Sequence, residues 1–240
     1  TYNNKLFYFS QKLKINKISR HYQILLRNLS REKYTLKLLI KYLTNYCKDR
    51  DSDNELIKIE SSSIGNPSDL ISINNKIYTS KFLDEFLKYL EIKKYVNFEK
   101  INKFLEIGPG VGIFSEVLAK LFNNLKIYLI DIPPQLYVTQ NYLKTIFPNE
   151  VATYSMIKKD PSILNSKKYR IFIIAPWQLE TINFVELDFA FNQVSFSEMR
   201  KETVESYLTL LRKWNTKIIN LRSVADVTSK VEPTTISDSN

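Results

Sequence analysis

The chain has 240 residues, of which 44% are hydrophobic, so it can bury the core of one full-sized domain and an appendage. The formal net charge is +10 and the pI is about 9.4, which admits a nucleic acid, an anionic membrane surface or a phosphorylated substrate as a partner. The single cysteine excludes an internal disulfide. One cysteine and one histidine are too few for a Cys/His zinc site, and the histidine lies far in the sequence from the motifs described below, which disfavours a Ser-His-Asp triad.

The first fifty residues predict an N-terminal helical region. Apolar residues recur there at helical spacing, at Leu6, Phe9, Leu13, Tyr22, Leu25, Leu29, Leu36, Ile40 and Leu43. His21 lies in this basic stretch, where we expect it to pack or to face solvent. The polar run Arg50–Asn54 is a candidate boundary. We therefore expect a helical region over residues 1–55, which is a candidate homo-oligomer contact, and a second domain over residues 56–240.

A serine-rich segment and a helix precede the central motif of the chain. The run Glu60–Pro67 is a loop by composition, and its hydroxyls and Asn66 are alternative candidates to line a cofactor or substrate site. Residues Lys81–Tyr95 place Phe82 and Phe86 on one side of an expected amphipathic helix.

The central motif is a strand, a glycine loop, a helix and a second strand. The apolar run Phe104–Ile107 is interrupted only by an acid and leads into three of the chain's four glycines, Gly108, Gly110 and Gly112. A helical pattern then covers residues 113–121, and the apolar run Lys126–Ile130 ends in Asp131. This order is typical of a nucleotide-type cofactor site, because glycine lets the backbone approach a ligand and the acid can accept hydrogen bonds from ribose hydroxyls.

The spacing of the glycines distinguishes between cofactors. The NAD pattern is G-x-G-x-x-G, but here the third glycine comes one residue early and Ile113 stands in its place. The form Glu-x-Gly-x-Gly-x-Gly instead resembles motif I of class I methyltransferases, which bind S-adenosylmethionine (SAM). A carboxylate at Glu106 suits SAM, since it can help to hold an ammonium group directly or through water. The expected cofactor contacts are Glu106, Gly108, Gly110, Gly112, Asp131 and Ile132.

The rest of the chain alternates strand and helix patterns. We expect helices over residues 137–147 and 201–214, strands over 169–175, 184–191 and 216–221, and an ill-defined polar segment over 149–168. This alternation predicts an α/β fold with a Rossmann-like, doubly wound, mostly parallel sheet that binds ligands at the carboxyl ends of its strands. The polar tail from Ser223 holds no pattern for the antiparallel edge of a full class I methyltransferase, so we expect its C-terminal strands to be truncated.

From Ser61 to Leu221 the chain resembles bacterial sugar O-methyltransferases linked to surface polysaccharides. The motifs that carry this resemblance are Ile64-Gly-Asn-Pro67, the loop after Glu106, Ile130-Asp-Ile-Pro133, Pro176-x-Gln178 and, most distinctively, Asn192-x-x-Ser-Phe-Ser-Glu-Met199. The glycine loop departs from the family's frequent Gly-Gly-Gly-x-Gly-Gly. The resemblance implies that the SAM methyl group is transferred to a sugar hydroxyl of a small-molecule or glycan acceptor.

Two loops on the predicted rim carry further candidate side chains. Trp177 would stack on adenine and Gln178 would hydrogen-bond it, while a buried structural tryptophan is an equal alternative. An alcohol is a poor nucleophile until it begins to lose its proton, so a positioned base would help. We expect Glu198 to be that base, with Asn192 and Ser195 as orienting groups.

The alternatives at this rim are structural roles. Glu198 could instead balance the dipole of the helix over 201–214, with Ser197 as its N-cap. Asp188, expected within a strand, favours a structural role. Asn66 and Ser195 are the expected substrate contacts, and we expect no metal ion because acids typical of a metal site do not cluster in the sequence.

Other function classes fit less well. Leu-Glu-Ile-Gly-Pro-Gly also resembles motif I of rRNA adenine dimethylases, and the net charge suits RNA. Those enzymes need Asn/Asp-x-Pro-Tyr/Phe after the fourth strand, whereas Asn192–Ser195 lacks proline, so a nucleic-acid partner is disfavoured. A non-catalytic SAM-fold scaffold is a further alternative, and the glycine spacing disfavours an NAD dehydrogenase. Without an apolar run of about 18 residues, we expect no transmembrane helix and a cytoplasmic location, with peripheral membrane contact left open.

Overall fold

The computed structural model describes residues 7–10, 33–182 and 186–222. At its centre is a seven-stranded sheet in the order β1-β9-β8-β4-β5-β7-β6, and each neighbouring pair is parallel. The strands are β1 (Phe7–Ser10), β4 (Lys103–Ile107), β5 (Lys126–Ile130), β6 (Val151–Ala152), β7 (Ile171–Ile174), β8 (Phe189–Gln193) and β9 (Ile218–Arg222). The expected Rossmann-like α/β fold with a mostly parallel sheet is confirmed.

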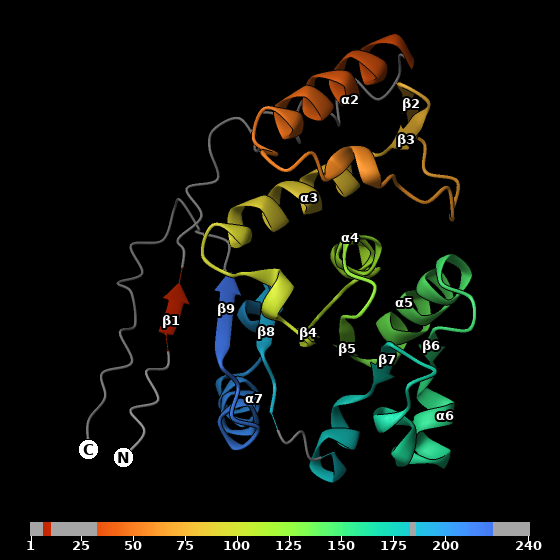
Figure 1. Ribbon diagram of the computed structural model, residues 1–240. Coiled ribbons are helices and arrows are strands. Elements are labelled where there is room, and N and C mark those ends of the chain that lie inside the picture. The colour runs from red at the N-terminus through yellow and green to blue at the C-terminus, as the bar shows by residue number, and fades with distance from the viewer. Residues whose placement is uncertain (1–6, 11–32, 183–185, 223–240) are drawn as a thin grey trace.

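Helices cover both faces of the sheet (Figure 1). The α-helices are α2 (Lys33–Lys48), α3 (Ser80–Lys93), α4 (Ile113–Leu121), α5 (Pro133–Ile146), α6 (Tyr154–Lys159) and α7 (Lys201–Lys213). Apolar side chains of α3, α4 and α5 pack on one face in a cluster with Phe104 and Phe189, whereas α6 and α7 pack on the other face with Leu105 and Ala190. Successive strand residues point to opposite faces, so a strand that is covered on both sides reads as a nearly continuous apolar run.

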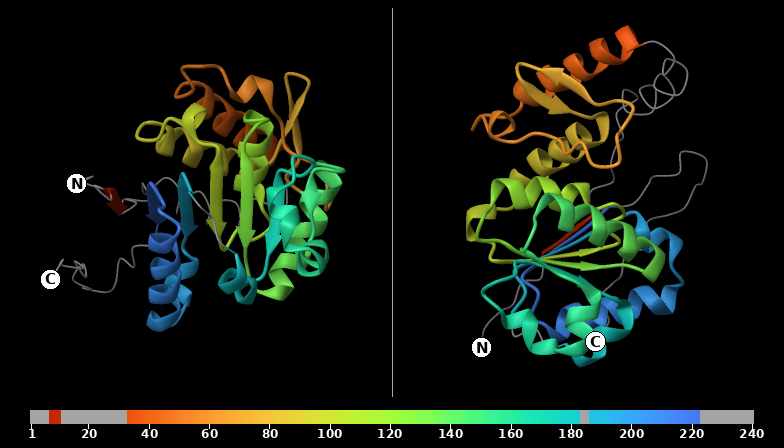
Figure 2. Two further views of the ribbon diagram at one scale, coloured as in Figure 1. Left: turned by 60° about the horizontal axis from the view of Figure 1, so that its bottom comes forward. Right: turned by 90° about the vertical axis from the view of Figure 1, so that its right-hand side faces the viewer.

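The segment from α2 to α3 forms a further layer over the first face. Figure 2 shows α2 and the hairpin of β2 (Ile71–Ile73) and β3 (Lys76–Tyr78) on the side of α3 away from the sheet. Ile40 and Cys47 of α2 belong to the same apolar cluster as Phe104 of β4. The hydrophobic core is therefore continuous from α2 to the sheet across residues 50–55, where the sequence suggests a boundary.

The structure corrects the predicted secondary structure near the N-terminus. The helical prediction is wrong at Phe7–Ser10, which is a strand paired in parallel with β9. Residues 1–6 and 11–32, with His21, lie outside the described part of the chain, as does the tail from Ser223. The helical prediction is confirmed for α2.

Other boundaries differ by a few residues. Residues 149–168 are ordered as β6, α6 and a 3-10 helix over Pro161–Asn165 rather than ill-defined. The strand expected over 184–191 is β8 at Phe189–Gln193, so Asp188 precedes the strand instead of lying within it. Helix α7 begins after Arg200, which is its N-cap, and Ser197 therefore does not cap it.

Candidate functional site

The glycine loop joins β4 to α4 at the carboxyl end of the sheet. The Gly108 amide donates to the Ile130 carbonyl oxygen at 2.8 Å, which ties the start of the loop to the end of β5. At Gly110, φ is +59° and nothing lies within 4 Å of the position that a Cβ would take. The backbone is thus open to close approach by a ligand at this glycine. Gly112 is the N-cap of α4.

Glu106 lies beneath the loop and is buried, with 3% of its surface exposed. The Ser115 hydroxyl, in the first turn of α4, donates to Glu106 Oε2 at 2.5 Å. Burial raises the pKa of Glu106 to about 8; the Ser115 hydrogen bond opposes this, and the charge of Glu85 adds to it. The carboxyl group is therefore mostly protonated at neutral pH in the unliganded chain, and an approaching ammonium group would favour its ionised form.

The acid after β5 lies on the same rim. Asp131 directly follows β5, whose last residue pairs with the last residue of β4. Burial raises the pKa of Asp131, while the amides of Ile132 and Gly110 oppose that rise. Ile132 donates its amide to Asp131 Oδ1 at 2.8 Å and is the N-cap of α5. The Ile132 side chain is 59% exposed and thus available to a ligand.

The loop after β7 begins a 3-10 helix over Pro176–Thr181. Trp177 is 55% exposed and meets Tyr154 edge-to-face, with ring centroids 6.1 Å apart. The alternative of a buried structural tryptophan is therefore wrong, and stacking on adenine stays a prediction. Gln178 Oε1 accepts from the Ala175 amide at 2.8 Å, so one of its polar atoms is occupied within the turn.

The loop after β8 is bound to the glycine loop. Buried Asn192 donates Nδ2 to the Ile107 carbonyl oxygen at 2.9 Å and also contacts Ser195 Oγ, while its Oδ1 accepts from the Phe196 amide. Ser195 Oγ donates to the same Ile107 carbonyl at 3.2 Å. A Cβ on Gly108 would lie 2.3 Å from this hydroxyl. Asn192 and Ser195 thus hold β8 and the glycine loop together, which is a positioning role.

The β8 loop contains two further residues of interest, Val194 and Glu198. Val194 has a φ of +69°, which is strained for a β-branched residue, and its amide donates to the Arg222 carbonyl oxygen at 2.7 Å. Glu198 ends the 3-10 helix Ser195–Glu198 and is exposed. It lies two residues before the N-cap of α7 and not in the first turn of that helix, and balancing the helix dipole stays an alternative role.

Arg222, which the sequence analysis missed, lies at the end of β9 beside this rim. Its side chain is 1% exposed and forms an ion pair with Glu91 of α3. Its Nε and Nη1 atoms are buried and have no hydrogen-bond partner in the described part of the chain. The sequence does show a charged residue at the end of an apolar strand, which could have marked Arg222 as a candidate. Its ion pair with Glu91 could not be predicted, because the two residues are brought together only by the tertiary structure.

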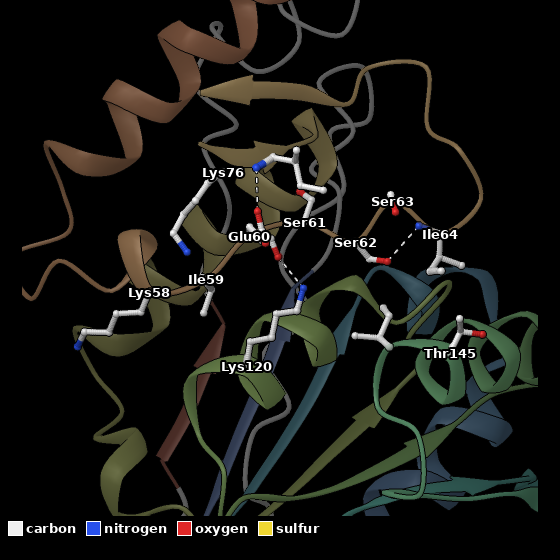
Figure 3. Close-up of a pocket in the computed structure, with 12 residues that line it drawn as sticks. Lys58, Ile59, Glu60, Ser61, Ser62, Ser63, Ile64, Lys76, Lys120 and Thr145 are labelled. Atoms are coloured by element: carbon white, nitrogen blue, oxygen red, sulfur yellow. Dashed lines mark hydrogen bonds between the residues drawn. The ribbon is translucent and has the colours of Figure 1, made fainter. Parts of the chain in front are cut away.

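A separate cavity of about 480 Å³ lies away from the glycine loop (Figure 3). It is lined by residues 58–64, Lys76, Ile77, Lys120, Thr145 and Ile146. Lys120 is in the last turn of α4, roughly 10 Å along that helix from the loop that begins it. The serines of residues 61–63 therefore line a cavity at the other end of α4, and Asn66 is an exposed residue of the loop that follows.

Two kinds of feature are absent from the described residues. Their His, Cys, Asp and Glu side chains form no group of three or more that could hold a metal ion. Within the same described ranges, no helix has the length and apolar character needed to cross a membrane.

Comparison with known proteins gives one significant sequence similarity. No protein-family model matches the chain. It is 29% identical over 144 residues to malonyl-(acyl-carrier protein) O-methyltransferase 1 of Ilyobacter polytropus. The aligned region covers 55% of this chain and 53% of that protein. The chain therefore spans about half the length of this curated relative.

Solved structures give weaker likenesses. A SAM-dependent methyltransferase from Aquifex aeolicus is 19% identical, with 53% of this chain and 55% of that chain covered and a TM-score of 0.33. A Podospora anserina methyltransferase solved with S-adenosylhomocysteine is 11% identical, with 85% and 66% covered and a TM-score of 0.39. These scores are too low to carry an argument. The parallel sheet, the glycine loop and the similarity to the O-methyltransferase instead support a Rossmann-like fold of the class I SAM-dependent methyltransferase type.

Proposed function

We propose that the chain is a SAM-dependent O-methyltransferase. The observation that carries the proposal is the arrangement at the ends of β4 and β5, where the backbone of Gly110 is open to a ligand and hydrogen-bonds Asp131, and where buried Glu106 is the last residue but one of β4. Asp131 would accept hydrogen bonds from the ribose hydroxyls of SAM. Glu106 would interact with its ammonium group, directly or through water. Bound SAM supplies an electrophilic methyl group on its sulfonium.

The acceptor in this proposal is a sugar hydroxyl. Its support is the resemblance of Asn192–Met199 to sugar O-methyltransferases, since this segment forms the turn that adjoins the glycine loop. Asn192 and Ser195 would fix the position of that turn, and exposed Glu198 would accept the hydroxyl proton. The relative from Ilyobacter polytropus acts, by its name, on a malonyl group, so a carrier-bound malonyl thioester is the second acceptor to test.

Calorimetric titration of the purified chain with SAM, S-adenosylhomocysteine and NADH tests the cofactor. We expect micromolar binding of the first two ligands and none of NADH. Asp131→Ala should weaken SAM binding about tenfold to a hundredfold, because hydrogen bonds to a charged group contribute roughly 1.5–3 kcal/mol each. Asp49→Ala is the matched control, since Asp49 is an exposed acid at the end of α2.

Equal weakening by both substitutions, or NADH binding in preference to SAM, would contradict the cofactor assignment. With binding established, transfer of labelled methyl from SAM to nucleotide sugars, malonyl thioesters and RNA separates the acceptor classes. Labelling of RNA alone would overturn the sugar proposal.

A further inference from the structure

Polar residues of α3 interact with residues near the carboxyl ends of β4 and β9. Asp84, Glu85, Lys88 and Glu91 follow helical spacing and lie on one side of α3. Glu85 and Lys88 affect the ionisation of Glu106, and Glu91 forms an ion pair with Arg222. Figure 1 shows the end of β9 beside the C-terminal end of α3. One helix side therefore connects the proposed cofactor residue Glu106 with Arg222.

The sheet register places Arg222 on the same face as Glu106. Glu106 pairs with Phe191, and Phe191 pairs with Asn220. Side chains two residues apart on a strand share a face, so Arg222 lies on this face one step closer to the rim than Asn220. Neighbouring strands are about 4.8 Å apart, which puts Arg222 roughly 10 Å across the sheet from the start of the glycine loop. That separation suits an acceptor beside a cofactor rather than a contact with the cofactor's own loop.

Three buried polar atoms of this region have no hydrogen-bond partner among the described residues. A guanidinium group carries five N–H donors, yet Arg222 Nε and Nη1 are buried without an acceptor and Glu91 contacts only Nη2. Asn220 Oδ1 is likewise a buried acceptor without a donor. Buried polar groups in folded proteins are nearly always hydrogen-bonded, so unpaired donors and acceptors on one face point to a ligand with complementary groups.

We infer that Arg222 and Asn220 bind the methyl acceptor and that this acceptor is an acidic sugar, such as a uronic acid. A carboxylate matches the planar donors of Arg222, and a neighbouring hydroxyl would donate to Asn220 Oδ1. The inference rests on the proposed function, because it names the substrate class of the same site. It also gives a further partner to a buried arginine whose ion-pair partner is a half-exposed glutamate.

Titration of the full chain with glucuronate, glucose and inorganic phosphate, at constant ionic strength, tests the inference. Glucuronate and glucose differ at one carboxylate, and phosphate is an anion without a sugar. We expect saturable glucuronate binding that raises the melting temperature, with at least tenfold weaker binding of glucose and of phosphate. Arg222→Met should weaken glucuronate binding at least tenfold. Arg170→Met is the matched control, since Arg170 also pairs with a glutamate but precedes β7 at the opposite end of the sheet, and it should bind glucuronate like the wild type.

A second variant keeps the test decisive if Arg222→Met does not fold. Glu91→Gln retains Arg222 and removes the carboxylate charge that competes for it, so it should strengthen glucuronate binding severalfold. Unchanged or weaker binding in Glu91→Gln, equal binding of glucose, preference for phosphate, or no binding by folded wild-type protein would each overturn the inference. SAM is titrated into the same samples. SAM binding without glucuronate binding refutes the acidic acceptor alone, whereas glucuronate binding without SAM binding refutes the proposed function.

Discussion

Asn192 and Ser195 at the rim are held in place by hydrogen bonds to the backbone of the neighbouring strand. Asn192 and Ser195 both bind the Ile107 carbonyl, and Val194 between them takes a strained conformation. Glycine at position 108 leaves room for the Ser195 hydroxyl. The loop after β8 and the glycine loop therefore pack closely against one another.

Gly108→Ala and Gly110→Ala form a matched pair that tests this fit. Both positions have positive φ, so each alanine should cost about 1–2 kcal/mol in the free energy of unfolding. Only the alanine at 108 would also meet Ser195, which should add about 1–3 kcal/mol of overpacking. Chemical denaturation measures both changes. Adding Ser195→Gly should recover part of the loss in Gly108→Ala, and equal stability of the two single variants would refute the close fit.

The proposed base gives a kinetic prediction. Glu198→Gln removes the group that would accept the hydroxyl proton, so turnover should fall about 10²–10⁴-fold while SAM affinity stays the same. Methyl transfer to the identified acceptor gives turnover, and calorimetry gives the affinity. Glu202→Gln, in the first turn of α7 and also exposed, should keep full turnover. Unchanged turnover in Glu198→Gln would remove this residue as the base.

At the scale of elements, Asp188 connects the start of β8 to the starts of β4 and β9 through hydrogen bonds. Its Oδ2 accepts from the amides of Asn102 and Lys103, and its Oδ1 accepts from Lys217 Nζ at 2.7 Å. Burial alone would raise the pKa of Asp188, but these hydrogen bonds outweigh it and lower the pKa. A carboxyl group with a lowered folded-state pKa stabilises the fold above its unfolded pKa of about 3.9, and this contribution is lost as the pH falls through the folded value.

Asp188→Asn should therefore lower the free energy of unfolding by roughly 2 kcal/mol at pH 7. The difference from the wild type should shrink as the pH falls below about 4, because protonation then removes the same charge from the wild type. Urea denaturation across this pH range measures the effect. A difference that is independent of pH would contradict the charged role.

The alternation of strands and helices could be predicted from the sequence because each strand is an apolar run and most helices have an apolar side. The elements that were missed lack such signals. β1 has four residues, and its partner β9 is more than two hundred residues away in the chain. The site was predictable where a motif is local, as from Glu106 to Gly112. The role proposed for Arg222 was not predictable from the sequence. It depends on the strand register that places Arg222 on the same face as Glu106 and on the ion pair with Glu91 of α3.

For the whole molecule, Glu106 links protonation to folding and to ligand binding. Its pKa of about 8 in the folded chain exceeds the unfolded value of about 4.3, so between these values the folded state holds a proton that the unfolded state has lost. This group therefore makes the free energy of unfolding fall as the pH rises through that window, and Glu106→Gln should remove that part of the slope.

SAM binding should reverse this protonation. An ammonium group near Glu106 favours the carboxylate, so binding at pH 7 should release up to about one proton. Calorimetry in buffers with different ionisation enthalpies counts the released protons. Glu106→Gln should release none, and identical proton release in both proteins would assign it to another group.

The parallel pairing of β1 with β9 has a consequence for the edge of the sheet. Each of the four residues of β1 pairs with a residue of β9, which lies more than two hundred positions away in the sequence. Once β1 has docked, β9 no longer presents a free edge to other chains, and β1 is the outer strand instead. Docking therefore replaces a five-residue edge by a four-residue edge, and short edge strands limit edge-to-edge pairing between molecules.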